Sequence, residues 1–256
     1  GFQYARRLID SAKIRLGTFQ LPVDWIADDE TFQKELKRLP ECAKMAAEIG
    51  CLRCVATLSP ASNDRPYHEN FEFHRQRFQE ICKALEPSGV SLGLGFRAAE
   101  YLRKNQAFQF IHDLDAMTLL INMVAMPNIG LLLDAWDLTV AGGSPDAVRK
   151  LPAQQIIAVQ IADLPEGVAM ADLDDKSRLL PVAEGSRVNA VGFLTMLKEI
   201  GYAGPVTVVP SRGIFQTRRR DMIVKQSSEA LDKVWRAAGL APERKAAPTT
   251  SGTRGF

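Results

Sequence analysis

Six short apolar segments alternate with helical patterns along this chain, and this alternation constrains the fold more than any other feature. A repeated strand–helix order argues for a parallel sheet covered by helices. The expected strands are Lys13–Phe19, Cys51–Leu58, Val90–Phe96, Asn128–Leu133, Ile156–Ala162 and Val206–Val209. The expected helices are Ala5–Ala12, Phe32–Ile49, Phe71–Glu86, Asp113–Val124, Pro145–Leu151, Ala190–Ile200 and Asp221–Ala238.

Two ways of closing such a sheet suit the chain. One is an open, doubly wound sheet, and the other is a (β/α)₈ barrel, which normally takes about 250 residues. The chain has 256 residues but only six expected strands, and it begins inside a helical segment. A leading part of a barrel could therefore have been lost. No Gly-x-Gly-x-x-Gly follows the first strand, which weakens a dinucleotide-binding interpretation.

Composition excludes several classes of partner. The net charge of +2 gives no reason to expect nucleic acid or a membrane surface. No apolar run approaches the roughly 18 residues that cross a bilayer, and the first residues lack the apolar centre of a signal peptide. Cys51-Leu-Arg-Cys54 has zinc-site spacing but no second Cys or His pair. We expect buried thiols and a reducing cytoplasm.

The segment Ile129–Leu133 is the clearest indication of where a site should lie. It is apolar without alternation, as in a strand that is buried on both faces. Asp134 follows it directly, and the carboxyl ends of parallel strands are where α/β proteins place their sites. The alternative interpretation is an Asp that caps a turn.

Four motifs of the chain point to one family. They are Pro127-Asn-Ile-Gly-Leu-Leu-Leu-Asp134, Arg178-Leu-Leu-Pro181 with Glu184-Gly185, Ile200-Gly-Tyr-Ala-Gly-Pro-Val206, and Pro66-Tyr-His-Glu-Asn-Phe71. With these motifs the chain, from about residue 12 to residue 240, resembles the xylose isomerase-like TIM-barrel family of sugar and sugar-phosphate isomerases and epimerases. The resemblance implies that the six strands are the third to eighth of a (β/α)₈ barrel.

The domain organisation follows from this resemblance. We expect residues 1–240 to form a single TIM-barrel domain of the α/β class that lacks its first one or two strands. We expect residues 241–256, which are rich in Pro, Lys, Thr, Ser and Gly, to form a disordered tail.

The resemblance also implies a metal site. Family members hold a divalent ion (Mn²⁺, Mg²⁺ or Zn²⁺) with Glu, Asp, His and Glu from the ends of four successive strands. The ion holds adjacent hydroxyl and carbonyl oxygens and stabilises the enediolate charge. The two Glu carboxylates move the proton at carbon. Carboxylate oxygens and an imidazole suit these ions.

This chain keeps one of the four ligands. Asp134 stands in the place of the family's Asp, but Gly95 and Val209 replace the two Glu, and Gln160 replaces the His. Gln160 is only a weak neutral donor, and Gly and Val cannot titrate. We therefore expect the metal to be lost or weakly bound.

Part of a ligand pocket is retained in the sequence. Arg178 and Asp163 are kept, and Asp137 stands where family members often carry a substrate-contacting His. The leading hypothesis is a degenerate member, a pseudoenzyme that binds a sugar or polyol through Trp136, Asp137, Asp163 and Arg178. Trp136 could stack on a sugar face or form part of the core.

Two alternatives remain open. The first is an active isomerase or epimerase whose metal site is rebuilt from Asp137, Asp163 and one carboxylate of residues 172–175. It requires three or more of these carboxylates around one point. The second is a non-catalytic scaffold that pairs with an intact paralogue, with contacts through Arg218–Arg220 or the tail; association of identical copies is also possible. We expect His68, His74 and His112 to be solvated or on helix surfaces.

Overall fold

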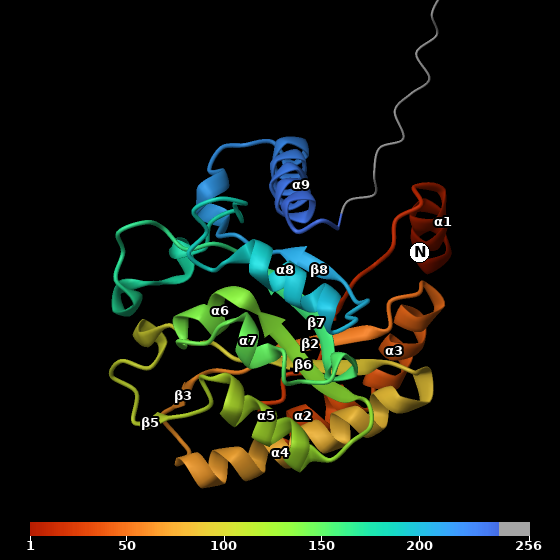
Figure 1. Cartoon of the computed structure of the whole chain (residues 1–256). Helices are drawn as coiled ribbons and strands as arrows, with labels where there is room; N and C mark the ends of the chain where they lie inside the picture. The colour runs from red at the N-terminus through yellow and green to blue at the C-terminus, as the bar shows by residue number, and fades with distance from the viewer. Residues whose placement is uncertain (241–256) are drawn as a thin grey trace, which may run out of the picture.

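A curled sheet of six parallel strands forms the centre of the molecule (Figure 1). The computed structural model describes residues 1–240. The strands pair in the order β1-β2-β4-β6-β7-β8, and β3 and β5 form a small separate antiparallel pair. The strand bounds are β1 Phe19–Gln20, β2 Arg53–Thr57, β3 Ala61–Ser62, β4 Ser91–Gly95, β5 Phe108–Gln109, β6 Ile129–Asp134, β7 Ile156–Ile161 and β8 Val206–Val208. The central sheet is the larger part of a TIM barrel.

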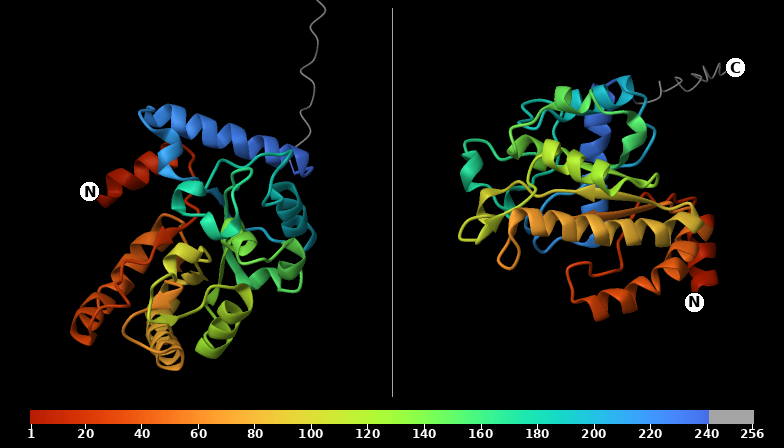
Figure 2. Two further views of the ribbon diagram at one scale, coloured as in Figure 1. Left: turned by 90° about the vertical axis from the view of Figure 1, so that its left-hand side faces the viewer. Right: turned by 90° about the horizontal axis from the view of Figure 1, so that it is seen from below.

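The helices lie on the outer side of this sheet (Figures 1 and 2). The α-helices are α1 Phe2–Ser11, α2 Asp29–Leu36, α3 Leu39–Glu48, α4 Tyr67–Leu85, α5 Leu114–Val124, α6 Ala135–Val140, α7 Pro145–Val148, α8 Ala190–Glu199 and α9 Arg220–Ala237. Short 3₁₀ helices are η1 Glu86–Ser88, η2 Glu100–Leu102, η3 Ala153–Gln155, η4 Met170–Asp172, η5 Asp175–Ser177 and η6 Arg212–Phe215.

The predicted strands are confirmed to within one or two residues at each end, except the first. Only Phe19 and Gln20 pair with the sheet, through β2. The prediction of a strand from Lys13 is therefore wrong. Lys13 has a positive φ of 53°, and Ile14, one of the apolar residues of the predicted strand, is exposed. Among the described residues, the segment before Phe19 forms no ladder pairing that would make it a strand.

Three helical predictions also need correction. The helix predicted over Phe32–Ile49 is two helices, because Pro40 lies in the first turn of α3 and cannot donate the hydrogen bond that would continue α2. Helix α4 begins at Tyr67, directly after Pro66, and not at Phe71. The earlier start was not predicted because the first turn carries polar residues that conceal the apolar repeat. Helix α6 was not predicted, since it is only six residues long.

Two apolar layers hold the barrel together. The larger lies between the sheet and the helices, and a small one inside the barrel consists of Val55, Leu132 and Ala158. Leu132 pairs in register with Ala158. Since side chains alternate along a strand, the residues two positions further on, Asp134 and Gln160, also point into the barrel, at the carboxyl ends of β6 and β7.

Two further predictions concern the ends and the surface of the chain. The predicted tail at residues 241–256 lies outside the described residues. Within the described part, no helix is long and apolar enough to span a membrane.

Candidate functional site

A cavity of about 390 Å³ opens at the carboxyl ends of the strands. Strand register brings its walls to one level, since Thr57 pairs with Gly95 and Asp134 pairs with Gln160. Val209, directly after β8, lines the same cavity. The four positions at which the family resemblance predicts metal ligands, Gly95, Asp134, Gln160 and Val209, therefore all face one space.

Both oxygens of the Asp134 carboxylate accept hydrogen bonds from other groups of the protein. Its Oδ1 accepts hydrogen bonds from the backbone N–H groups of Trp136 (2.9 Å) and Asp137 (3.3 Å), so that Asp134 caps the N-terminus of α6. Its Oδ2 accepts a hydrogen bond from the guanidinium of Arg178. Asp134 therefore caps a helix, as one interpretation of the sequence predicted, and it also lines the cavity.

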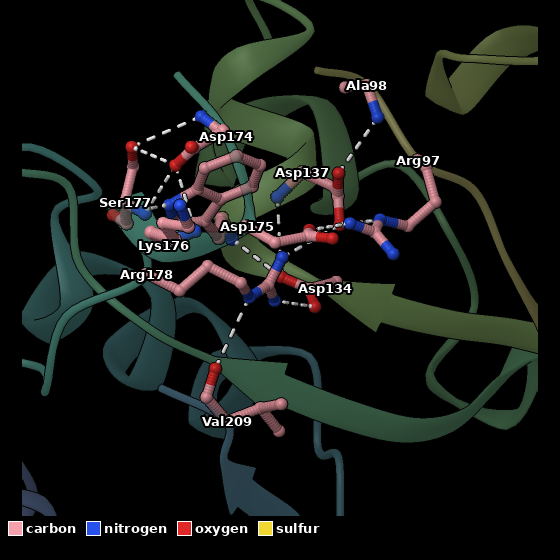
Figure 3. A network of polar contacts seen from close by, with 11 residues as sticks. Arg97, Ala98, Asp134, Asp137, Asp174, Asp175, Lys176, Ser177, Arg178 and Val209 are labelled. Carbon is pink, nitrogen blue, oxygen red and sulfur yellow. Dashed lines mark hydrogen bonds and ion pairs between the residues drawn. The ribbon is translucent and has the colours of Figure 1, made fainter. Parts of the chain in front are cut away.

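Arg178 is the centre of the polar network at the cavity (Figure 3). Besides Asp134, its guanidinium donates to Asp137 Oδ2 at 3.1 Å and to the carbonyl of Val209 at 3.3 Å. Arg178 is only 7% exposed, and its guanidinium carbon lies 4.8 Å from the centre of the Trp136 ring. This cation is held between two carboxylates and a carbonyl.

Asp137 is the most buried carboxylate of the site, with 1% of its surface exposed. Its Oδ1 accepts a hydrogen bond of 2.8 Å from the backbone N–H of Ala98, and Arg97 Nε lies 3.8 Å from its Oδ2. Burial, and after it the neighbouring carboxylate of Asp134, raises the pKa of the Asp137 carboxyl to about 6 against the opposing charges of Arg178 and Arg97.

The loop before Arg178 is fixed by its own hydrogen bonds. Asp174 accepts from the backbone N–H groups of Lys176 (2.9 Å) and Ser177 (3.1 Å), and the Ser177 hydroxyl reciprocates as an acceptor for the N–H of Asp174. This capping box holds η5 at the cavity. Asp175, the first residue of η5, pairs with Arg97 across the opening.

Two residues that the sequence offered as ligand contacts lie outside the cavity lining. Trp136 is 0% exposed and packs beneath Arg178, where its indole N–H donates to the carbonyl of Ser177 at 3.4 Å. The carboxylate of Asp163 accepts from four backbone N–H groups, those of Leu164, Val182, Arg187 and Val188, and so fixes the loop after β7. Asp137 and Arg178 do line the cavity.

The donor set does not fit a catalytic divalent ion. Gly95 and Val209 carry no ligand atom in their side chains, and the oxygens of Asp134 are already bonded. A Cβ atom added at Gly95 would lie 3.2 Å from the side chain of Leu132, so Leu132 already fills the space in which a longer side chain would start. Among residues 1–240, no three His, Cys, Asp or Glu side chains converge on a common point.

The same finding corrects the alternative of a rebuilt aspartate site. That alternative requires Asp137, Asp163 and a carboxylate of residues 172–175 around one ion. Instead, the carboxylate of Asp163 accepts hydrogen bonds from backbone N–H groups. Asp174 caps η5, and Asp175 is paired with Arg97. The described residues do not bring the required three carboxylates together.

The prediction for His74 is wrong, because this residue is buried. It is 4% exposed, its ring centre lies 4.9 Å from that of Phe110, and its Nδ1 lies 2.7 Å from the carbonyl of Asn70. Burial lowers the pKa of His74 to about 4. His68 is exposed and His112 half-buried. None of the three lines the cavity described above.

Five polar or charged cavity residues were not identified from the sequence: Thr57, Arg97, Lys176, Ser211 and Arg212. Thr57 ends β2, Arg97 and Ser211 stand in loops, and Lys176 and Arg212 belong to the short helices η5 and η6. The only available signal was the position of Arg97, two residues after Gly95, where the chain leaves β4.

Comparison with known proteins establishes the family. The profile described as "Xylose isomerase-like TIM barrel" matches residues 2–234. This chain belongs to the xylose isomerase-like TIM-barrel family. A xylose isomerase domain protein from Alicyclobacillus acidocaldarius subsp. acidocaldarius is 25% identical, with a TM-score of 0.83 over 93% of this chain and 84% of that one.

Two curated relatives match about half of this chain. A 3-dehydroshikimate dehydratase of Pseudomonas putida is 27% identical over 118 residues, which are 46% of this chain and 17% of that protein. An inosose isomerase of Bacillus subtilis (strain 168) is 26% identical over 129 residues, 50% of this chain and 43% of that protein. The matched stretches thus span less than half of either relative.

A bound metal occurs within this fold. The structure described as IOLI protein with a binding zinc atom has a TM-score of 0.73 and 18% identity, over 91% of this chain and 82% of that one. At this identity the likeness is one of fold. The ligand positions of the present chain are therefore judged on its own residues.

Proposed function

We propose that this chain is a ligand-binding member of the family in which metal-dependent isomerisation is lost and a pocket for a sugar or polyol is kept. The observation that carries the proposal is the state of the four ligand positions at the cavity. Asp134 is the one carboxylate among them, and it is bound to Arg178 and to the N-terminus of α6. The positive charge next to it is a guanidinium that belongs to the protein.

The loss of proton-carrying groups supports the same proposal. Isomerisation at a carbon next to a carbonyl needs a group that removes a proton and one that returns it. Gly95 and Val209 stand where the family resemblance places the two Glu, and neither side chain titrates. Asp137 also lines the cavity and its carboxyl has a raised pKa. Both of its oxygens, however, already accept hydrogen bonds, one from the N–H of Ala98 and one from Arg178.

Retention of a pocket is supported by what lines it. Gln160, Thr57 and Ser211 offer neutral donors and acceptors beside the charged groups, which is the mixture that polyhydroxylated ligands require. Both curated relatives carry names that refer to a polyhydroxylated carbonyl compound, 3-dehydroshikimate in one and inosose in the other.

The experiment separates binding from turnover. The protein is incubated in D₂O with an inosose or with D-fructose, with and without Mn²⁺, and the carbon-bound protons are followed by NMR. We expect saturable binding by calorimetry but no incorporation of deuterium at the carbon next to the carbonyl. Deuterium incorporation that requires the protein would contradict the proposed loss of isomerisation, and the absence of binding would contradict the pocket.

A further inference from the structure

The cavity carries more cations than carboxylates. Four of its lining side chains are positive (Arg97, Lys176, Arg178 and Arg212), and three are carboxylates (Asp134, Asp137 and Asp175). Each carboxylate is already paired: Asp134 and Asp137 with Arg178, and Asp175 with Arg97. Because two carboxylates share Arg178, these seven groups sum to one net positive charge, and the cations outside the pairs are Lys176 and Arg212.

Arg97 is committed to carboxylates of the protein. Its guanidinium pairs with Asp175, and Figure 3 shows it extending toward Asp137 and Asp175. Its Nε is closed to solvent, makes no hydrogen bond and lies 3.8 Å from an oxygen of Asp137. A ligand at the opening therefore meets Lys176 and Arg212 rather than this atom.

Lys176 and Arg212 supply the unpaired charge. They belong to the short helices η5 and η6, which lie in contact beside the cavity. Both side chains are exposed, and within the part of the chain that the structure describes neither forms an ion pair. Two cations without an ion-pair partner at the opening attract an anionic group.

The backbone around these cations favours a carboxylate over a phosphate. Phosphate groups are commonly held by free backbone N–H groups at helix starts. Here the N–H groups of Lys176 and Ser177 donate to Asp174, and that of Gly213 donates to the Ser211 hydroxyl at 3.2 Å. Side chains are the donors that remain, and the planar fork of arginine matches either anion. The preference for a carboxylate therefore comes from the engaged backbone N–H groups.

We propose that the ligand of this cavity is a polyhydroxylated carboxylic acid, with its carboxylate held by Lys176 and Arg212 at the opening. This inference rests on the proposed function, because it presupposes a ligand in this cavity, and it adds the chemical class of that ligand.

Three compounds that share one hydroxylated carbon chain test the class. Calorimetry compares D-gluconate, the neutral D-glucitol and D-glucitol 6-phosphate on the whole protein. We expect D-gluconate to bind about tenfold more tightly than D-glucitol, as one charge-assisted contact would give. The double variant Lys176→Gln/Arg212→Gln should lose this advantage and keep its affinity for D-glucitol.

A matched control removes the same net charge elsewhere. Arg38 and Lys44 are exposed residues at the start of α3 and within it, and Arg38→Gln/Lys44→Gln should leave the D-gluconate affinity unchanged. Equal affinities for D-glucitol and D-gluconate would overturn the inference and leave the proposed function standing. Tighter binding of the phosphate, or equal weakening by the control variant, would also overturn it. If none of the three compounds binds, the proposed pocket fails as well.

Discussion

The guanidinium of Arg178 donates a hydrogen bond to the carboxylate of Asp134, 44 positions earlier in the chain. The side chains of both residues are only 9% exposed. Arg178 reaches Asp134 from the loop after η5, whereas Asp134 ends β6. Asp134, the one carboxylate at the four positions where the family resemblance predicts metal ligands, is therefore paired with a cation of the protein itself.

Removing Arg178 should destabilise the fold strongly. The variant Arg178→Ala leaves Asp134 and Asp137 buried without their cation, and breaking a buried ion pair costs about 3–5 kcal/mol. Urea denaturation monitored by circular dichroism measures this loss. The control is Arg236→Ala, which removes an exposed pair with Asp232 on α9 and should cost less than about 1 kcal/mol. Similar losses in both variants would mean that the pair in the cavity has no special role.

Asp137 should make stability depend on pH between about 4 and 6. Its pKa is raised from 3.8 to about 6 in the folded protein, so in this range the folded state binds more protons than the unfolded state. The contribution of Asp137 is therefore fully present below pH 3.8 and is lost as pH rises through 6, by a total on the order of 3 kcal/mol.

The comparison with Asp137→Asn isolates this term from the other carboxylates. The unfolding free energy of the wild type minus that of the variant should fall as pH rises from 4 to 7. Asn keeps an oxygen that can accept from the N–H of Ala98, so the variant preserves much of the geometry. A difference that stays constant over this range, or that rises with pH, would show that the Asp137 pKa is not raised.

Gly130 should not tolerate a side chain. A Cβ atom at this position in β6 would overlap the carbonyl oxygen of Gln155 and the side chain of Ile157. The clash involves backbone, so Gly130→Ala should cost about 1–3 kcal/mol or more. Gly213→Ala is the control, since its Cβ would meet only the Ser211 hydroxyl at 3.4 Å. Thermal unfolding of the two variants measures the difference, and equal melting temperatures would contradict this packing.

Much of the fold could be predicted because the central strands are buried on both faces. Residues 129–133 and 156–159 are apolar without interruption, and this pattern is short enough to distinguish a strand from a helix. The segment from Lys13 misled the prediction because its apolar residues alternate without a partner strand. Whether a strand forms there depends on its neighbours in the sheet, which a local pattern does not contain.

The site was predictable where a residue type and a strand end coincide. Asp134 and Gln160 follow from the ends of β6 and β7, and the family motif gives Arg178. Gln160 lies within β7 and points into the barrel. Asp163 lies beyond the end of β7, and its carboxylate points toward the following loop. Arg97 is a single charge in a loop and Arg212 is one in the short helix η6, and only the folded chain brings them to one cavity.

The carboxylate of Asp134 is bonded to Arg178 and to the start of α6, and the three other ligand positions, Gly95, Gln160 and Val209, carry no charged donor. A Mn²⁺ titration of the wild type and of Asp134→Ala, followed by the relaxation of water protons, tests directly whether this donor set holds an ion. We expect no saturable site in either protein. A tight one-to-one site in the wild type that is lost in Asp134→Ala would show that the metal site is retained.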